Sequence, residues 1–420
     1  MAHRLSAKWL RSLVLALAIA TGALAVTACG SSSSSGGSSS GGSSSASGGE
    51  TVKIGVIVPL TGGYAETGKA SLQGAEAGVN YLNEGGAESG DTYELVTKDD
   101  KGDPTQTASA AREMAGEGVT MMIPVITQGG ASAVQPILNQ SKILFISPNN
   151  LEIAEGMKEG GEYPWAFSTG PTFSQYAEGF AEYAKNVLKV KKFGELYASS
   201  PNGEFFVSSF EPSAEREGLE IVKQSFPETQ SDVTAQLGQL KSEGAEAVGI
   251  WAYGTPQINV FKSFAKLGWK VPIVSDLGTA EPAVLESLKE VSPELLEEVV
   301  VGPIAKSLTV SKNGAPSEDA LARAFAEKLK AVTGAPLNGN SVISEYEFDS
   351  VVALDRGIKG AGSTEPEAIA KYFSTTPVEI AQGKTVWPEE RGGAVGNSEI
   401  GLMKANSDFA NGTGLAVPTE

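Results

Sequence analysis

Cysteine and histidine are almost absent from this 420-residue chain, which contains one of each, Cys29 and His3. Serine and cysteine hydrolases of the common kind need a histidine beside the nucleophile, and zinc sites use His or Cys in nearly all cases. The sequence therefore excludes these chemistries and leaves only enzymes built on Asp, Glu, Lys or Tyr. We expect no enzymatic activity, no cofactor and no metal site.

Acidic residues are absent from the first 28 positions, whose four ionisable side chains all precede an uncharged run over residues 12–28. This layout is typical of a secretory signal peptide. The uncharged run is about 17 residues long, at the short limit for a roughly 30 Å hydrocarbon core, so a permanent transmembrane anchor is the alternative.

The sequence Val26-Thr27-Ala28-Cys29 closes this segment and resembles the lipobox of bacterial lipoproteins. The resemblance implies that residues 1–28 are removed and that Cys29 receives a diacylglycerol, whose two chains hold a protein stably. The alternative is an unmodified thiol. We therefore expect an exported protein that is lipid-anchored to the outer face of the cell membrane.

Only Gly, Ser and one Ala occupy residues 30–49, and such a segment buries no apolar surface. With Cys29 and residue 50 it is interpreted as a lipidated tether over residues 29–50. A flexible coil of this length reaches on the order of 25 Å, which lets the folded part sample orientations above a membrane.

Positive charge is scarce in the remainder. Three of the 32 Lys and Arg residues lie in the first 28 positions, which leaves 29 against 50 acids and a formal charge of −21. Phosphates and anionic head groups repel such a surface. No nucleic-acid partner is expected, and the membrane contact is expected to come from the lipid alone. The length exceeds one ordinary core and predicts two domains.

Short apolar, β-branched runs recur along the chain and are typical of buried parallel strands. They lie at 52–59, 93–97, 119–126, 143–147, 193–198, 247–253, 271–275 and 299–304. Helical stretches separate most of them, which predicts an α/β fold with helices on both faces of a parallel sheet. A single closed barrel is the alternative, and the irregular segments at 150–164 and 302–316 argue against it.

Helix boundaries can also be predicted. Asp103 followed by Pro104 and Gln106 provides an N-cap, a proline at the first helical position and a glutamine at the third. A helix is likewise expected from Thr255 to Gly268, and another is expected between residues 317 and 334.

Several landmarks in order resemble type I periplasmic binding proteins, in particular the leucine/isoleucine/valine-binding family of ABC transporters. They are Ile54-Gly55-Val56, Pro59-Leu60-Thr61-Gly62, Gly74-Ala75-Glu76, Asp99-Asp100, Gly102-Asp103-Pro104, Ile146-Ser147-Pro148, Phe167, Thr169, Gly254 and Phe348-Asp349-Ser350. The resemblance runs from about residue 52 to residue 355.

The resemblance implies two doubly wound, Rossmann-like lobes joined by a three-strand hinge, with ligand in the cleft. The N-terminal lobe is expected at 51–169 plus 302–383, and the C-terminal lobe at 170–301 plus 384–420. Chain crossings are then expected near Thr169, Val301 and Gly383. The expected partners are a small-molecule ligand and an ABC permease and ATPase complex, with the protein acting as a monomer.

Ligands of open parallel sheets bind beyond the carboxyl ends of the strands. This rule selects residues 61–67, 127–132 and 149–153 in the first lobe, and 199–205, 252–256 and 276–280 in the second. Gln128, Gly129 and Gly130 stand between a strand and a helix, so their amides are candidates to hold a ligand carboxylate. Asn149 and Asn150 are candidates beside them, and the alternative for both groups is an ordinary turn.

Aromatic residues are candidates in these loops because their faces supply contact area and attract cations. Tyr64 and Tyr253 are expected to contact ligand, whereas Trp251 is expected in the core. Asn202 occupies a loop position at which the family often has an aromatic residue, and it is kept as a candidate.

Asp276 could neutralise a ligand ammonium group or could cap the turn that follows it. The amino-acid binders of the family carry a threonine where Leu151 stands, and a glutamate one position away from Asp276. These differences leave an amino acid, an amide, a urea-like compound or an aromatic acid as possible ligands.

Two other functions fit parts of the sequence. The same fold could present ligand to a signalling partner as a sensor, and this alternative stays open. A hydrolase could use Asp99 and Asp100, but adjacent strand residues point to opposite faces and cannot easily flank one bond. We expect Asp100 or Asp103 to cap local backbone instead.

Overall fold

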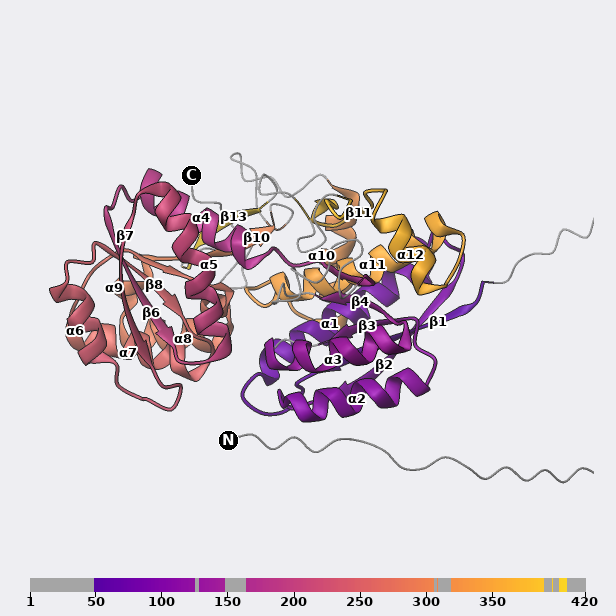
Figure 1. Ribbon diagram of the computed structural model, residues 1–420, viewed down its shortest axis with the longest axis horizontal. Helices are drawn as coiled ribbons and strands as arrows, with labels where there is room; N and C mark the ends of the chain where they lie inside the picture. Colours follow the sequence, from indigo (N-terminus) through magenta and orange to yellow (C-terminus); the bar gives the residue numbers. More distant parts are fainter. Residues whose placement is uncertain are drawn as a thin grey trace, which may run out of the picture. The chain divides into compact units, whose positions relative to one another are not determined.

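The computed structural model describes residues 49–124, 128–147, 164–305, 308, 319–388, 395 and 400–405. Within these ranges the chain forms two doubly wound α/β lobes, each built on a largely parallel sheet with helices on both faces (Figure 1). The predicted fold class is confirmed. The signal segment, Cys29 and nearly all of the tether lie outside the described residues, as do Asn149 and Asn150.

The first sheet has five parallel strands in the order β2-β1-β3-β4-β5. These are β1 (Thr51–Val58), β2 (Thr92–Asp99), β3 (Met121–Pro124), β4 (Leu144–Ser147) and β5 (Ala166–Ser168). Both faces are covered, which explains why β1 is apolar without alternation.

Helices from two parts of the chain cover this sheet. One face packs on α1 (Ala65–Tyr81), α11 (Ser341–Ala361) and α12 (Pro366–Phe373), and the other on α2 (Pro104–Gly116) and α3 (Gln128–Ser141). A π-helical turn, η1 (Leu82–Gly86), continues α1. The late helices thus complete the lobe that begins with β1.

The second sheet has the order β13-β10-β9-β8-β6-β7, and only β13 is antiparallel to its neighbour. Its strands are β6 (Lys192–Ala198), β7 (Glu220–Phe226), β8 (Ala247–Trp251), β9 (Ile273–Ser275), β10 (Val299–Ala305) and β13 (Ile400–Lys404). Strand β10 stays in this sheet to Ala305, beyond the crossing expected near Val301.

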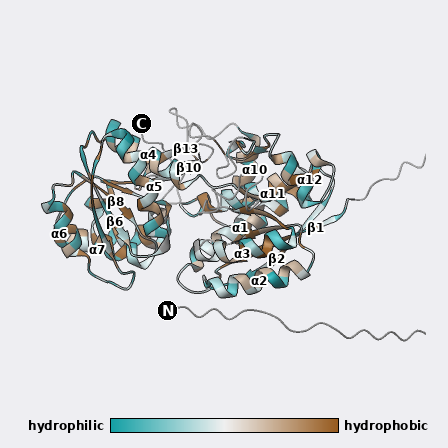
Figure 2. Cartoon of the chain, in the orientation of Figure 1, coloured by the Kyte–Doolittle hydropathy of each residue, from teal (hydrophilic) through white to brown (hydrophobic). Residues whose placement is uncertain are grey.

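The second sheet is also covered on both faces. One face packs on α4 (Phe173–Asn186) and α5 (Pro201–Glu217), and the other on α6 (Thr234–Ser242), α7 (Thr255–Leu267) and α8 (Pro282–Val291). The short helices η3 (Leu277–Ala280) and α9 (Pro293–Leu296) flank α8, and α10 (Ala320–Thr333) follows β10. Apolar residues lie on the strands and hydrophilic ones face outward on the helices (Figure 2).

The expected helix boundaries are confirmed. Asp103 caps α2 by accepting hydrogen bonds from the amides of Thr105 and Gln106, both at 2.9 Å. Helix α7 begins at Thr255 and ends at Gly268, which adopts the left-handed conformation, φ 60°. None of the helices in the described ranges is long and apolar enough to cross a membrane.

Helices α1 and α11 approach closely because two glycines of α1 lie at their contact. A β-carbon at Gly74 would meet the carbonyl oxygen of Ser344 at 2.1 Å, and one at Gly78 would meet Cβ of Val351 at 2.8 Å. Alanine at either position would push the helices apart, because the main chain of Ser344 and the Cβ atom of Val351 cannot move without moving α11.

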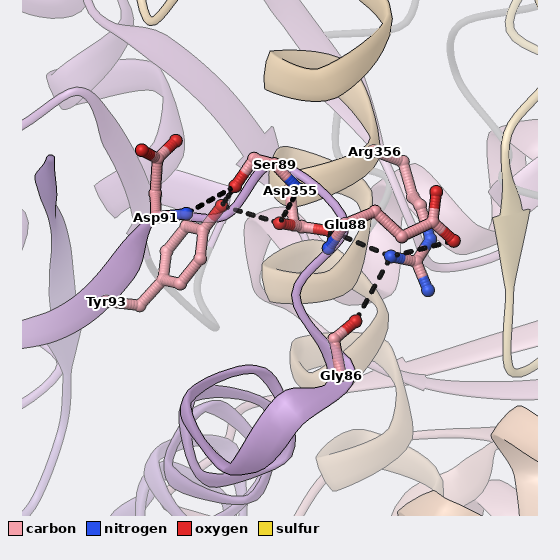
Figure 3. A network of polar contacts seen from close by, with 7 residues as sticks. All are labelled: Gly86, Glu88, Ser89, Asp91, Tyr93, Asp355 and Arg356. Carbon is pink, nitrogen blue, oxygen red and sulfur yellow. Dashed lines mark hydrogen bonds and ion pairs between the residues drawn. The ribbon is translucent and has the colours of Figure 1, made fainter. Parts of the chain in front are cut away.

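A polar network fastens α11 to the segment between η1 and β2 (Figure 3). The buried carboxylate of Asp355 accepts hydrogen bonds from the amides of Glu88 and Ser89, at 2.9 and 3.1 Å, and from the Tyr93 hydroxyl at 2.8 Å. Arg356 donates to Asp355 at 2.7 Å and forms an ion pair with Glu88 at 3.2 Å. Since these groups satisfy one another, the network is structural.

Candidate functional site

A cavity of about 800 Å³, counting the space at its mouth, lies where loops and helix ends of the two lobes meet. Its polar side chains from the first lobe are Tyr64, Thr67 and Asn340. Those from the second lobe are Tyr176, Asn202, Tyr253 and Glu281. Pro171, Phe173, Leu277 and Ile343 supply apolar walls. A cavity of this composition suits a small molecule with a few polar groups.

Three candidate residues from the sequence line this cavity, namely Tyr64, Asn202 and Tyr253. Tyr253 follows the end of β8, and Tyr64 immediately precedes α1. Asn202 lies in the first turn of α5, the helix that follows β6. The strand-end rule therefore brings together residues that are up to 189 positions apart in the sequence.

Asp276 lies directly behind the cavity wall. Its Oδ1 atom accepts a hydrogen bond from the Gly278 amide at 2.8 Å and caps η3, so the capping role considered for it is present. A β-carbon at Gly278 would meet this oxygen at 2.9 Å and the Tyr253 ring at 3.0 Å. The second oxygen, Oδ2, is buried and has no hydrogen-bond partner among the described residues.

The glycines proposed to hold a carboxylate lie in the first turn of α3, which begins at Gln128. A β-carbon at Gly129 would touch the Pro104 ring of α2 at 3.0 Å. Neither Gly129 nor Gly130 is among the described residues that line the cavity, and the Gln128 side chain is outside the described part. Their contact with a ligand stays a prediction.

Thr67, Tyr176, Glu281 and Asn340 were missed from the sequence. Thr67 falls inside the selected loop 61–67, but a threonine near a helix start carries no special signal. Glu281 stands one position beyond the selected loop 276–280, before Pro282 at the start of α8. The position of Glu281 directly before a helix could have marked it as a candidate site residue. Asn340 lies in the turn before α11. This turn follows helix α10 and not a strand, so the strand-end rule does not select it.

Thr67 and Glu281 connect the two lobes across the cavity. The Thr67 hydroxyl on α1 donates a hydrogen bond of 2.6 Å to Oε1 of Glu281, which precedes α8. The carboxyl group of Glu281 is therefore fixed by a residue that is 214 positions away. The geometry links the position of this acid to the approach of the lobes.

The cavity is bordered by acidic groups. Burial and then the nearby carboxyl of Glu281 raise the pKa of Asp276 well above its usual range, although the Gly278 amide opposes this shift. Burial and then the Asp276 carboxyl raise the pKa of Tyr253. Burial raises the pKa of Tyr64, and Glu228 and Glu281 add to the effect.

No Lys, Arg or His is found among the described residues that line the cavity. Two acids and three tyrosines therefore face or adjoin a space without a compensating cation in that lining. A buried carboxylate without a partner is costly, and a bound cation removes the cost. Tyrosine faces also attract cations. The arrangement is suited to a protonated amine.

Other candidate groups have structural roles. Trp251 is buried in the second lobe, stacks on Phe206 at 3.9 Å between ring centroids, and donates to Glu195, in agreement with the expected core position. Asp99 accepts from Leu60 and Thr61.

Asp100 is equally occupied, since it accepts from the Gly102 amide at 2.9 Å and the Thr107 hydroxyl at 2.8 Å. The pair Asp99 and Asp100 thus holds local backbone, which removes the support for a hydrolase. No group of three or more His, Cys, Asp or Glu side chains in the described ranges could hold a metal ion.

Comparisons with known proteins agree with the fold. Residues 51–410 match the family model described as periplasmic binding protein. A Leu/Ile/Val-binding protein homolog 3 from Brucella melitensis is 30% identical over 346 residues, which cover 80% of this chain and 87% of the relative.

Two solved structures share the fold. A branched-chain amino acid transporter substrate-binding protein from Streptococcus pneumoniae, in complex with isoleucine, has a TM-score of 0.70 at 21% identity, covering 88% of this chain and 99% of its own. An ABC transporter solute-binding protein from R. palustris, in complex with 4-hydroxybenzoate, has a TM-score of 0.69 at 20% identity, covering 88% and 96%.

Proposed function

The chain belongs to the periplasmic binding protein family, and on that premise we propose that it captures a small molecule carrying a protonated amino group and delivers it to an ABC importer. The relatives named for binding leucine, isoleucine and valine support an amino-acid-like ligand. We also propose that the protein is exported, anchored through lipid on Cys29, and active as a monomer.

The observation that carries the ligand proposal is the acidic, aromatic cavity wall at Tyr253 and Asp276. Oδ2 of Asp276 is buried without a hydrogen-bond partner among the described residues, and the Tyr253 ring lies beside the other oxygen of the same carboxyl. An ammonium group placed against both gains a charged hydrogen bond and a cation–π contact. Such a group also lowers the pKa of Asp276 back toward its usual range.

For a carboxylate on the same ligand, we propose the first turn of α3 at Gly129 and Gly130. Helix α3 is 14 residues long, and the positive end of its dipole stabilises an anion. Holding an anion in one lobe and an amine in the other explains why ligand would draw the lobes together. Asn149 and Asn150, which follow β4, remain proposed contacts on the same side.

The direct experiment is mass spectrometry of the small molecule released when freshly purified, natively folded protein is denatured. A compound with a primary amine is expected. Tyr253→Ala should then weaken binding of that compound by about 1–3 kcal/mol, or roughly 5- to 150-fold in dissociation constant, because a large apolar and π contact is lost. Isothermal titration calorimetry measures the change.

Tyr253→Phe is the matched control, since it keeps the ring and should lose much less affinity. Both variants should melt near the parent temperature without ligand, because Tyr253 lies at the cavity wall. A released ligand with no amine would overturn the proposed ligand class. Unchanged affinity in Tyr253→Ala would place the site elsewhere.

A further inference from the structure

Glu281 occupies an unusual position for a carboxyl group. It is the N-cap residue of α8, yet its side chain makes no hydrogen bond to the helix amides. The carboxyl is turned to Thr67 of the other lobe, which donates to Oε1 at 2.6 Å, and the residue lines the cavity. Glu281 therefore does not cap α8 with its side chain, and the carboxyl lies at the cavity instead.

The carboxyl of Glu281 has no cation to balance it within the described residues. None of the ion pairs found there involves Glu281, and none of the lining residues described is basic. Burial raises the pKa of Glu281, and the neighbouring Glu66 carboxylate raises it further, against the hydrogen bond from Thr67. A carboxyl in such a place is a candidate for function.

Asp276 and Glu281 stand at the two ends of η3, close enough for the charge of one to raise the pKa of the other. One ammonium group balances only one of two carboxylates. Oδ2 of Asp276 is also buried without a hydrogen-bond partner among the described residues. A ligand with a second positive group could therefore pair with the carboxyl that the first ammonium group leaves without a cation.

We propose that Glu281 is a specificity-determining residue, which receives a second amino group of the ligand at the point where Thr67 holds its carboxyl across the cavity. The proposal rests on the proposed function, in which Tyr253 and Asp276 receive the first amino group. The ligand class is then a diamino acid or a similar compound with two cationic groups. Thr67 acts as a positioning residue, because it fixes one oxygen and leaves the other for ligand.

Matched ligand pairs test this directly. Ornithine differs from norvaline, and lysine from norleucine, by one terminal amino group. Calorimetric titration of the full chain should give at least tenfold tighter binding for the diamino member of at least one pair. In Glu281→Gln this ratio should fall by about tenfold to a hundredfold, the scale of a hydrogen bond to a charged group.

Two further variants control for charge and for folding. Glu286→Gln removes an exposed acid from the same helix, where it pairs with Lys289, and should leave the ratio unchanged. Thr67→Val keeps the side-chain shape but frees the Glu281 carboxyl, and should reduce the ratio less than Glu281→Gln does. Melting temperatures without ligand identify any variant that fails to fold.

The outcomes separate the two proposals. Norvaline and norleucine binding as tightly as their diamino partners, or an unchanged ratio in Glu281→Gln, would overturn the role of Glu281 and leave the proposed function standing. Failure of all four compounds to bind, together with a released ligand that lacks any amine, would overturn both. A ratio that falls equally in Glu286→Gln would assign the effect to general charge and reject the specific site.

Discussion

Glu195 is a carboxyl group inside the aromatic core of the second lobe. It is fully buried on β6, its Oε1 atom accepts from Trp251 Nε1 at 3.0 Å, and Oε2 has no hydrogen-bond partner among the described residues. Burial raises the pKa of this carboxyl to about 8, and the indole hydrogen bond opposes the rise only in part. The folded protein therefore holds a proton here that the unfolded chain loses near pH 4.5.

Glu195→Gln should stabilise the protein in mild alkali. Because the folded-state pKa is raised, the stability contributed by the protonated form is full below the unfolded pKa and is lost as pH rises through about 8. Glutamine keeps the acceptor for Trp251 and never ionises. The variant should gain on the order of 3 kcal/mol in unfolding free energy at pH 8.5 and almost nothing at pH 5.

Urea unfolding at the two pH values measures this difference. Glu215→Gln, which changes an exposed acid on α5, should show no such dependence on pH. Equal effects of Glu195→Gln at pH 5 and pH 8.5 would mean that Glu195 is not protonated in the fold. Stabilisation only at high pH would support the interpretation that this acid is structural.

At the scale of residues, the sequence identified the aromatic part of the site better than the acidic part. Tyr64 and Tyr253 were predictable because each follows or faces a strand end, and the strand-end rule needs only the order of elements. Glu281 and Thr67 become meaningful only when two helix starts from different lobes meet. No local pattern encodes a hydrogen bond between residues 214 positions apart.

Helix α11 holds the turn formed by residues 381 and 382, and this turn also contacts the chain at Thr169. Asp349 on this buried helix accepts hydrogen bonds from the amides of Ala381 and Gln382, at 2.6 and 3.2 Å, and from Gln382 Nε2 at 2.8 Å. The same Nε2 atom donates to the carbonyl of Thr169 at 2.9 Å. Residues 381 and 382 form the turn between β11 (Glu379–Ile380) and β12 (Gly383–Lys384).

Asp349→Asn should destabilise the fold although the side chain keeps its size. Asparagine offers one acceptor oxygen, and its NH₂ group would face a backbone amide that also donates. One buried donor is left unsatisfied, at a cost of about 1–3 kcal/mol in unfolding free energy. Thermal and urea unfolding measure the loss.

Gln382→Met provides the graded comparison, since it removes the bonds of Nε2 to Asp349 and Thr169 but keeps the backbone bonds of the turn. Its cost should be smaller than that of Asp349→Asn. If Asp349→Asn unfolds like the parent, the turn is held by other contacts and the anchoring role is wrong.

Strands were predictable from the sequence where both of their faces are buried. Buried central strands such as β1 and β8 appear in the sequence as continuous apolar runs because both faces are covered. Strand β7 was missed because it alternates, carries Lys223 and pairs only with β6 at the edge of the sheet. Strand β5 spans three residues, too few for any periodic pattern.

At the scale of the whole molecule, the net negative charge and the Gly/Ser segment both bear on how the protein is held at a membrane. A formal charge of −21 after residue 28 gives the folded part no electrostatic attraction to anionic lipid. If the protein stays at the membrane, the attachment has to come from the first 29 residues. The Gly/Ser tether predicted from the sequence over residues 29–50 would then give the binding lobes reach toward an importer in the same membrane.

Cys29→Ser should therefore abolish stable attachment, because a serine hydroxyl does not take the place of the thiol that receives diacylglycerol in lipoproteins. Labelled palmitate should enter the parent protein and not the variant. The parent should partition into detergent, while the variant should accumulate as a longer precursor on denaturing gels. Ser31→Ala, two positions away, should behave as the parent does. Palmitate incorporation into Cys29→Ser would refute the lipobox interpretation, and the cavity and its acids would be unaffected by that result.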